Sequence, residues 1–217
     1  MKKRICCFIL AFILIAVCQA GCGKKDNGMK KVVLNEVAHS IFYAPQYVAI
    51  EMGYFKDAGI DLVLETGFGA DKTMTALISG NADIGFMGSE STIYAYAEGS
   101  KDYAVNFAGL TQRAGNFLVA REKIDNFSWD MVKGKNVLGG RKGGMPQMVL
   151  EYILKANNID PASDLSIDQS VDFGLTAGAF SGNTEYDFTV EFEPGATSLE
   201  KEGKGYVVAS LGVDSGY

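Results

Sequence analysis

The sequence predicts an α/β protein of two lobes, each with a mainly parallel sheet covered by helices. Short apolar strands alternate with helices along residues 31–120, the order that is typical of parallel, helix-covered sheets. A polar, irregular stretch follows at residues 121–135, and the alternation then restarts at Asn136. We therefore expect one lobe over residues 31–121 and a second over residues 122–217.

In the first lobe, Pro45 suits the first turn of a helix, and Gly53 and Gly80 suit helix ends. Asp71 is a candidate N-cap for the second helix. Alternating or short apolar runs predict the strands. The predicted strands are 32–37, 60–65, 82–87, 103–110 and 116–120, and the predicted helices are 44–52, 71–79 and 89–97.

The second lobe follows the same rules. A glycine-rich turn at residues 139–145 separates a short apolar strand from a helix with proline in its first turn. The predicted strands are 136–139, 189–192 and 206–209, and the predicted helices are 146–157 and 195–202.

The N-terminus predicts export. Lys2, Lys3 and Arg4 precede a 13-residue apolar run, Ile5–Val17, which suits a signal peptide and is short for a bilayer span. Small residues before Cys22 resemble a bacterial lipobox. We expect a signal peptide over residues 1–21, a lipid on Cys22, a polar tether over residues 22–30, and a body held at the outer face of a bacterial cell membrane.

Charge and cysteine content exclude several kinds of function. Without the three basic residues of the leader, 17 basic and 26 acidic residues remain, a net charge of −9. A body this acidic argues against binding to nucleic acid or to an anionic lipid surface. All four cysteines lie within the first 22 residues, so the body has no disulfide, zinc-thiolate site or thiol nucleophile.

Several short motifs together carry a resemblance to a known family. They are His39–Phe55 (HSIFYAPQYVAIEMGYF), Gly59–Leu62 (GIDL), Gly69–Lys72 (GADK), Leu77–Gly85 (LISGNADIG) and Phe192–Pro194 (FEP). As a set they resemble the solute-binding proteins of ABC importers for nitrate, sulfonate, taurine and thiamine-pyrimidine precursors. The likeness covers residues 31–212 and implies the type II periplasmic-binding-protein fold. Because members of that family run longer and return to the first lobe, we expect a C-terminally truncated chain that lacks this second crossover.

The resemblance implies a monomeric binder that needs no cofactor. It would capture a sulfonate, a nitrate-like anion or an amino-pyrimidine between the lobes and deliver it to a membrane permease. Two alternatives stay open. One is an enzyme like the fungal pyrimidine synthases, which share this fold and use pyridoxal phosphate, although they carry a cysteine-rich motif that this body lacks. The other is a sensory ligand-binding subunit.

Candidate ligand-binding residues in the first lobe follow predicted strand ends, where sites in open sheets usually lie. Aromatic rings there suit stacking on a flat solute, a hydroxyl or imidazole suits hydrogen bonding, and an arginine fork suits a carboxylate or sulfonate. Each also has an ordinary structural role, as a packed loop, a helix cap or an exposed cation. The candidates are His39, Ser40, Phe42, Tyr43, Gly88, Ser89 and Arg113.

In the second lobe, the glycine-rich loop 139–145 is the sharpest signal. Its glycines permit close backbone approach to a ligand, and Arg141 suits an anionic group. The loop has neither the Gly-Lys-Ser/Thr ending of a P-loop nor the dinucleotide fingerprint. We expect ligand contacts from Arg141, Gly143, Gly144 and Met145, and from Glu193, which matches the family's cleft-facing acid before proline.

The ligand's charge stays open at this stage, since Arg141 favours an anion whereas Glu193 and the aromatic residues favour a pyrimidine-like base. Catalysis lacks a pattern of its own. The body has one histidine, and no metal-ligand spacing or nucleophile motif is present.

Overall fold

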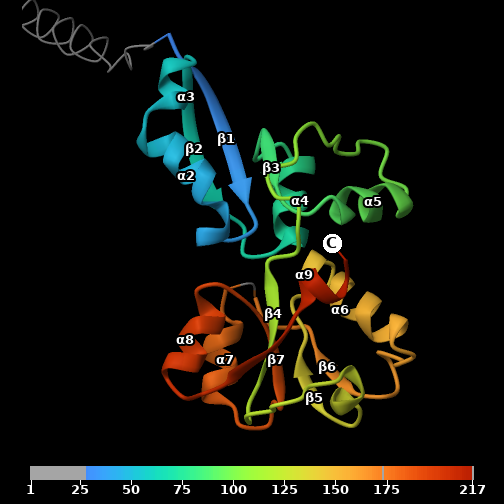
Figure 1. The fold of residues 1–217 in the computed structure, drawn as a ribbon. Coiled ribbons are helices and arrows are strands. Elements are labelled where there is room, and N and C mark those ends of the chain that lie inside the picture. The colour runs from blue at the N-terminus through green and yellow to red at the C-terminus, as the bar shows by residue number, and fades with distance from the viewer. Residues whose placement is uncertain (1–27, 173, 217) are drawn as a thin grey trace, which may run out of the picture. The chain divides into compact units, whose positions relative to one another are not determined.

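The computed structural model describes residues 28–172 and 174–216 (Figure 1). Contacts divide the chain into two units, residues 1–30 and residues 31–217. The predicted signal peptide and the lipidation site at Cys22 lie outside the described residues. Within the described ranges, no helix is both long and apolar enough to cross a membrane.

The first sheet has three strands in the order β2-β1-β3, and β1 and β3 are parallel. Helix α3 packs against β2, and α4 packs against β3. We call residues 30–97 the first-sheet region. Its elements are β1 (Lys30–Glu36), the 3₁₀ helix η1 (Ile41–Tyr43), α2 (Ala44–Glu51), α3 (Tyr54–Asp57), β2 (Ile60–Thr66), α4 (Ala70–Ile78), β3 (Ile84–Phe86) and α5 (Glu90–Ala97).

The second sheet has five strands in the order β6-β5-β7-β4-β8. Strand β5 is parallel to β6 and β7, whereas β4 is antiparallel to β7 and β8. We call residues 116–216 the second-sheet region. Its elements are β4 (Asn116–Ala120), the 3₁₀ helix η2 (Trp129–Val132), β5 (Asn136–Leu138), α6 (Met145–Ala156), β6 (Ser166–Asp168), α7 (Thr176–Gly182), β7 (Phe188–Phe192), α8 (Gly195–Lys201), β8 (Tyr206–Ser210) and α9 (Leu211–Asp214).

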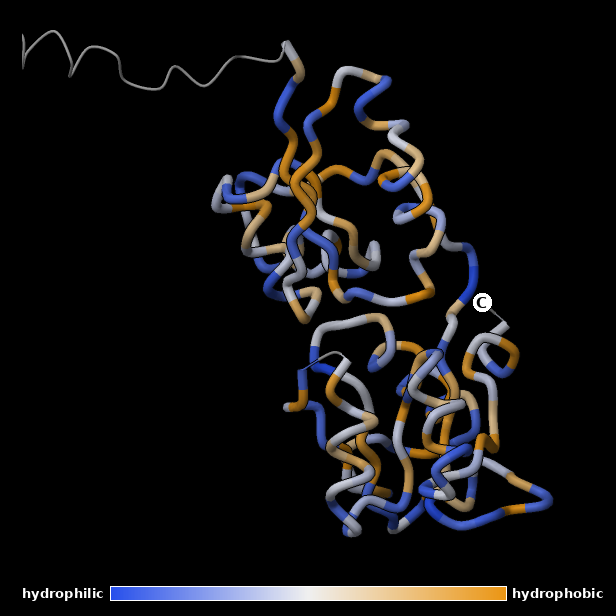
Figure 2. Tube along the Cα trace, turned by 90° about the vertical axis from the view of Figure 1, so that its left-hand side faces the viewer, coloured by the Kyte–Doolittle hydropathy of each residue, from blue (hydrophilic) through white to orange (hydrophobic). Residues whose placement is uncertain are grey.

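Strand β4 shows why both faces of the second sheet are covered. Side chains of successive strand residues point to opposite faces. Leu118 and Ala120 pack in one apolar cluster with α6 and α9, and Val119 packs in another with Phe180 of α7 and Leu199 of α8. Figure 2 shows hydrophobic stretches of chain inside this region. Burial on both faces explains why residues 117–120 of β4 are an unbroken apolar run rather than an alternating one.

The boundary that we predicted after residue 121 put β4 with the wrong sheet. Its residues pair with β7, from Asn116 opposite Phe192 to Ala120 opposite Phe188, so the second sheet already includes residue 116. The antiparallel partner of β4 lies 68 to 76 residues later in the chain, and the local sequence does not reveal it. The chain therefore passes from the first sheet to the second through residues 98–115.

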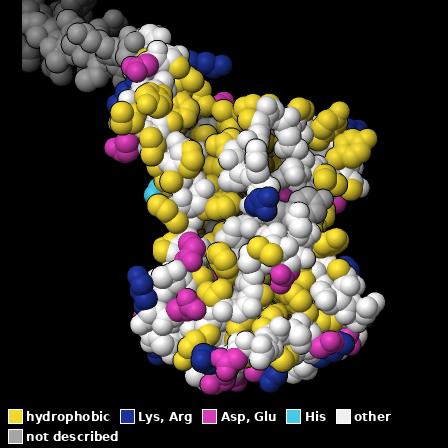
Figure 3. All heavy atoms as spheres, viewed as in Figure 1, with side chains coloured by type: hydrophobic (Ala, Val, Ile, Leu, Met, Phe, Trp, Pro, Cys, Tyr) yellow, Lys and Arg dark blue, Asp and Glu magenta, His cyan; other side chains and the backbone are white. Residues whose placement is uncertain are grey.

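The strand predicted at residues 103–110 is also wrong. This segment forms no strand, and it runs as an irregular connection between α5 and β4 (Figure 1). Its apolar side chains are exposed, with Val105 at 75% and Phe107 at 77%. Figure 3 shows hydrophobic side chains at the surface of this part of the molecule. The apolar alternation there is real, but no described strand pairs with it, and an unpaired segment gains no ladder hydrogen bonds.

Candidate functional site

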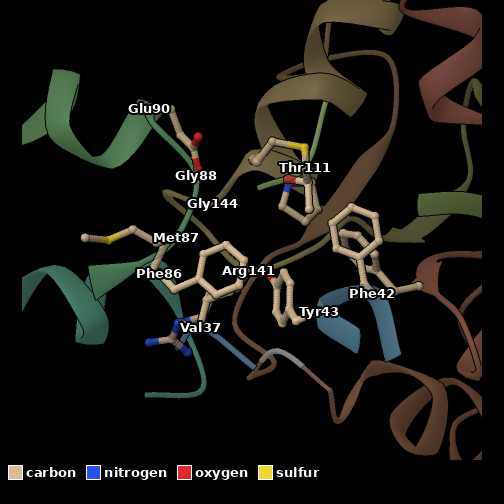
Figure 4. A pocket seen from close by; sticks show the side chains of 15 residues that line it. Val37, Phe42, Tyr43, Phe86, Met87, Gly88, Glu90, Thr111, Arg141 and Gly144 are labelled. Atoms are coloured by element: carbon tan, nitrogen blue, oxygen red, sulfur yellow. The ribbon is translucent and has the colours of Figure 1, made fainter. Parts of the chain in front are cut away.

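A pocket of about 70 Å³ lies where the two sheet regions meet (Figure 4). Residues that follow β1 and β3 line one part of it, and residues around β5, α6 and β7 line the other. Its lining residues are Val37, Phe42, Tyr43, Gly69, Ala70, Phe86, Met87, Gly88, Glu90, Thr111, Arg141, Gly144, Met145, Pro146 and Phe192. A more open hollow of about 500 Å³ shares Arg141 with this pocket and is lined also by Asp71.

Aromatic rings form much of the pocket wall. The ring centroids of Tyr43 and Phe86 lie 4.4 Å apart, and those of Phe42 and Phe192 lie 5.5 Å apart. The second contact joins the first-sheet region to the end of β7. Burial raises the pKa of the Tyr43 hydroxyl, with a further contribution from neighbouring Tyr47. The wall therefore presents flat, apolar surfaces and a hydroxyl that stays protonated.

A buried carboxyl group fixes the loop that carries these rings. Glu36 is fully buried at the end of β1. Its Oε2 accepts hydrogen bonds from Gln46 Nε2 (2.8 Å) and from the Tyr47 hydroxyl (2.9 Å), and its Oε1 lies 2.9 Å from His39 Nδ1. Tyr47 in turn accepts a hydrogen bond from the backbone N–H of Ser40 (3.0 Å). Residues 39–43 are thus anchored to the sheet before they reach the pocket.

Glu90 is the buried acid of the pocket. The residue is 4% exposed, and its Oε1 has no hydrogen-bond partner among the described residues. Burial raises the pKa of the Glu90 carboxyl, and the backbone N–H groups of Glu90 and Met145 offset part of that rise. The carboxyl group is turned toward Gly88 (Figure 4), where an added Cβ would collide with both of its oxygens. A side chain at position 88 would displace the acid.

Arg141 is held by two carboxylates. Its Nε and Nη2 donate to Asp71 Oδ1 (2.9 Å) and Oδ2 (2.8 Å), and its Nη1 donates to Asp172. Lys72 donates to both oxygens of Asp172 at 3.1 and 3.2 Å. The hydrogen bond from Arg141 lowers the pKa of Asp71 and raises that of Arg141. These four residues, which we call the charge cluster, join α4 to the second-sheet region and sum to zero charge.

The charge cluster leads to a prediction about stability. Arg141→Gln is expected to lower the free energy of unfolding by about 1 kcal/mol at low ionic strength, since the pairs are partly exposed. At about 1 M salt the difference should shrink, because such charges are screened. Urea unfolding at both salt concentrations measures this. Lys142→Gln, which removes the neighbouring exposed cation, is the control, and equal effects of the two substitutions would contradict the assignment.

The structure brings half of the predicted binding residues into the pocket. Each of them lies on an element end or loop where the sheet regions meet. They are Phe42, Tyr43, Gly88, Arg141, Gly144 and Met145.

The other predicted residues do not line the pocket. Glu193 accepts from the backbone N–H (3.1 Å) and hydroxyl (2.8 Å) of Thr197, so it holds the first turn of α8. His39 bonds to Glu36, and Ser40 caps η1 and donates to the backbone oxygen of Glu193 (3.4 Å). Further residues outside the pocket lining are Ser89, Arg113 and Gly143, of which Ser89 and Arg113 are exposed.

Sequence reasoning missed nine lining residues. Most are apolar or small, namely Val37, Gly69, Ala70, Phe86, Met87, Thr111, Pro146 and Phe192, and their types look the same in a core. Glu90 is the important omission. The signal was present, because an acid directly after Gly88-Ser89 sits at the start of a helix beside a strand end. Asp71, predicted as an N-cap, instead pairs with Arg141, and Gly69 occupies the N-cap position of α4.

Comparisons with known proteins agree with this architecture. YtlA of Bacillus subtilis (strain 168), named as a binding protein, is 49% identical over 216 residues, which are 100% of this chain and 64% of that protein. The alkanesulfonate-binding protein SsuA of Xanthomonas axonopodis pv. citri, solved with MOPS, has a TM-score of 0.66 at 16% identity and covers 84% of this chain and 60% of that one.

The nitrate-binding protein NrtA of Synechocystis PCC 6803 has a TM-score of 0.59 at 18% identity, covering 82% of this chain and 51% of that one. The two solved structures confirm the predicted two-lobed fold. The chain spans less than two thirds of the length of each of these three proteins. The family model described as NMT1/THI5 like matches residues 41–194, and the chain belongs to this family.

Proposed function

We propose that this chain is the solute-binding component of an ABC importer and captures a small polar solute in the pocket between its two sheet regions. The observation that carries the proposal is that residues of both sheet regions line one small pocket. Ligands of open α/β sheets bind at strand ends in such positions. The relatives that are named as binding proteins support the same reading.

Contacts around the pocket suggest how a solute would be retained. The charge cluster, the Phe42–Phe192 contact and the Ser40–Glu193 hydrogen bond all join the first-sheet region to the second. A solute that touches both regions favours the state in which they are together. In that state the solute is shielded from water, and the paired regions present one defined surface to a permease.

The remaining parts of the proposal rest on the sequence. Residues 1–21 act as a signal peptide, a lipid on Cys22 anchors the chain, and the body works as a monomer outside the cytoplasm. Named binding proteins among the relatives support the extracytoplasmic position. The partner is a membrane permease.

A binding screen tests the function. Methanesulfonate, nitrate, 4-aminopyrimidine and acetamidinium would each be added to the purified body, and at least one should raise the melting temperature and be recovered unchanged after dialysis. Phe42→Ala should abolish the rise, because it removes a pocket wall. The control Phe107→Ala, on a side chain that is 77% exposed, should keep it. If no compound moves the melting curve, or if a product appears, the binding function is wrong.

A further inference from the structure

The charges around the pocket distinguish between the classes of solute. Glu90 and Arg141 are the charged residues that line it in the described structure. The guanidinium of Arg141 is engaged by Asp71 through two hydrogen bonds and by Asp172 through a third. An incoming anion would have to displace carboxylates that already satisfy this fork. Arg141 is therefore committed to joining the two sheet regions.

Glu90 is in the opposite situation. It is 4% exposed, and its Oε1 lacks a hydrogen-bond partner among the residues described. A buried carboxyl oxygen without a partner costs free energy that a bound donor would recover. The donors of Arg141 are thus already bonded, whereas Glu90 Oε1 is an acceptor in the pocket wall without a partner among the described residues.

The start of α6 offers an anion no substitute for Arg141. Backbone N–H groups at a helix N-terminus ordinarily suit anions. In this structure the N–H of Met145, the first residue of α6, lies close enough to the Glu90 carboxyl to lower its pKa. A carboxyl group of the protein therefore already faces this helix end, and it would repel a second negative group.

The aromatic wall and the pocket size narrow the choice further. Ring faces attract cations and stack on planar groups, and Phe42, Tyr43, Phe86 and Phe192 contribute rings to the lining. A cavity of about 70 Å³ holds on the order of five water molecules. The group that enters the closed pocket is thus flat and contains only a few heavy atoms.

We propose that the pocket recognises a planar N–H-donating group of the amidine type, as found in amidinium ions and amino-pyrimidines, with Glu90 as its acceptor, and that it rejects oxyanions. This inference rests on the proposed solute-binding function and specifies its ligand class. Two adjacent N–H groups of an amidine match the two oxygens of a carboxylate. The aromatic rings would cover the faces of the same planar group.

Two pairs of isosteric ions test this assignment by calorimetric titration. Acetamidinium and acetate have the same shape and opposite charge, and so do guanidinium and nitrate. The cation of each pair should bind at millimolar concentration or better, and the anion should bind at least tenfold more weakly. The ions are used well below denaturing concentration, and equal ionic strength is kept with sodium chloride.

Variants separate the role of Glu90 from a general effect on folding. Glu90→Gln should weaken binding of both cations at least tenfold, whereas Glu98→Gln, an exposed acid at the end of the same helix, should leave it unchanged. Gly88→Ala, which displaces the Glu90 carboxyl, should also weaken binding. Gly109→Ala is its control, since an added Cβ at Gly109 meets no atom within 4 Å.

The outcomes distinguish this inference from the function on which it rests. Binding of nitrate or methanesulfonate with the strength expected for the cations would overturn the ligand class and leave the binding function standing. Unchanged cation binding by folded Glu90→Gln would remove Glu90 from the site. If none of the four ions of the two pairs binds, and neither methanesulfonate nor 4-aminopyrimidine binds, both proposals are wrong.

Discussion

Glu191→Gln is expected to stabilise the protein by about 3 kcal/mol at pH 8 and by almost nothing at pH 4. Glu191 lies in β7 and is 4% exposed. Burial raises the pKa of its carboxyl from 4.5 to about 7, although hydrogen bonds from the hydroxyls of Thr189 (2.7 Å) and Thr176 (2.9 Å) act in the opposite direction. The ionised form of Glu191 is therefore less favourable in the folded protein than in the unfolded chain.

The pH window follows from the two pKa values. Below pH 4.5 the carboxyl is protonated in both the folded and the unfolded chain and contributes no penalty. Between pH 4.5 and about 7 the unfolded chain loses the proton first, so stability falls as pH rises. Above about pH 7 both states are ionised, and the loss stays constant at about 1.4 kcal/mol for each pKa unit of difference.

Denaturant unfolding from pH 4 to pH 8 measures this difference. A glutamine amide keeps the size of the side chain, and its oxygen and nitrogen can each bond a threonine hydroxyl. Glu202→Gln, on an exposed residue just after α8, is the control and should follow the wild-type curve. If the unfolding free energies of wild type and Glu191→Gln run parallel from pH 4 to pH 8, the raised pKa of Glu191 is refuted.

Local patterns predicted most elements because they encode burial. The helix that begins beside Pro146 and the strand before Glu193 were found from proline position and apolar runs, and both are close to α6 and β7. The strand prediction for residues 103–110 was wrong because an apolar pattern encodes burial and does not show whether a neighbouring strand is available for pairing. Strand β6, which pairs with β5 in the sheet, was missed because two of its three residues, Ser166 and Asp168, are polar, so no apolar run marks it.

The site was only half predictable, because charge depends on partners far apart in the chain. Arg141 was predicted as an anion ligand, whereas in the structure Asp71, 70 residues earlier, and Asp172, 31 residues later, hold its guanidinium group. Glu193 was predicted as a ligand; in the structure it bonds Thr197 and lies outside the pocket lining. Glu90 gives the converse case. Its Oε1 lacks a partner among the described residues, and this property depends on the folded surroundings, which the local sequence does not reveal.

Glu36→Leu is expected to destabilise the protein by about 3 kcal/mol or more, because buried donors lose their acceptor. Gln46 is 5% exposed and donates to Glu36 at 2.8 Å, and Tyr47 donates at 2.9 Å. Leucine has a similar volume, so a cavity contributes little and the lost hydrogen bonds dominate. Urea unfolding at pH 7 measures the change, and Glu65→Leu, an exposed acid on β2, is the matched control.

The same substitution should reach the pocket, because Glu36 holds the loop that carries Phe42 and Tyr43. Burial raises the pKa of Tyr47 to about 12, and its hydroxyl joins Glu36 to the backbone of Ser40. Without the carboxyl group, Tyr47 loses its acceptor and residues 39–43 lose their anchor to β1. Acetamidinium should then bind Glu36→Leu more weakly than wild type even where both are fully folded. Unchanged affinity together with reduced stability would restrict Glu36 to a purely structural role.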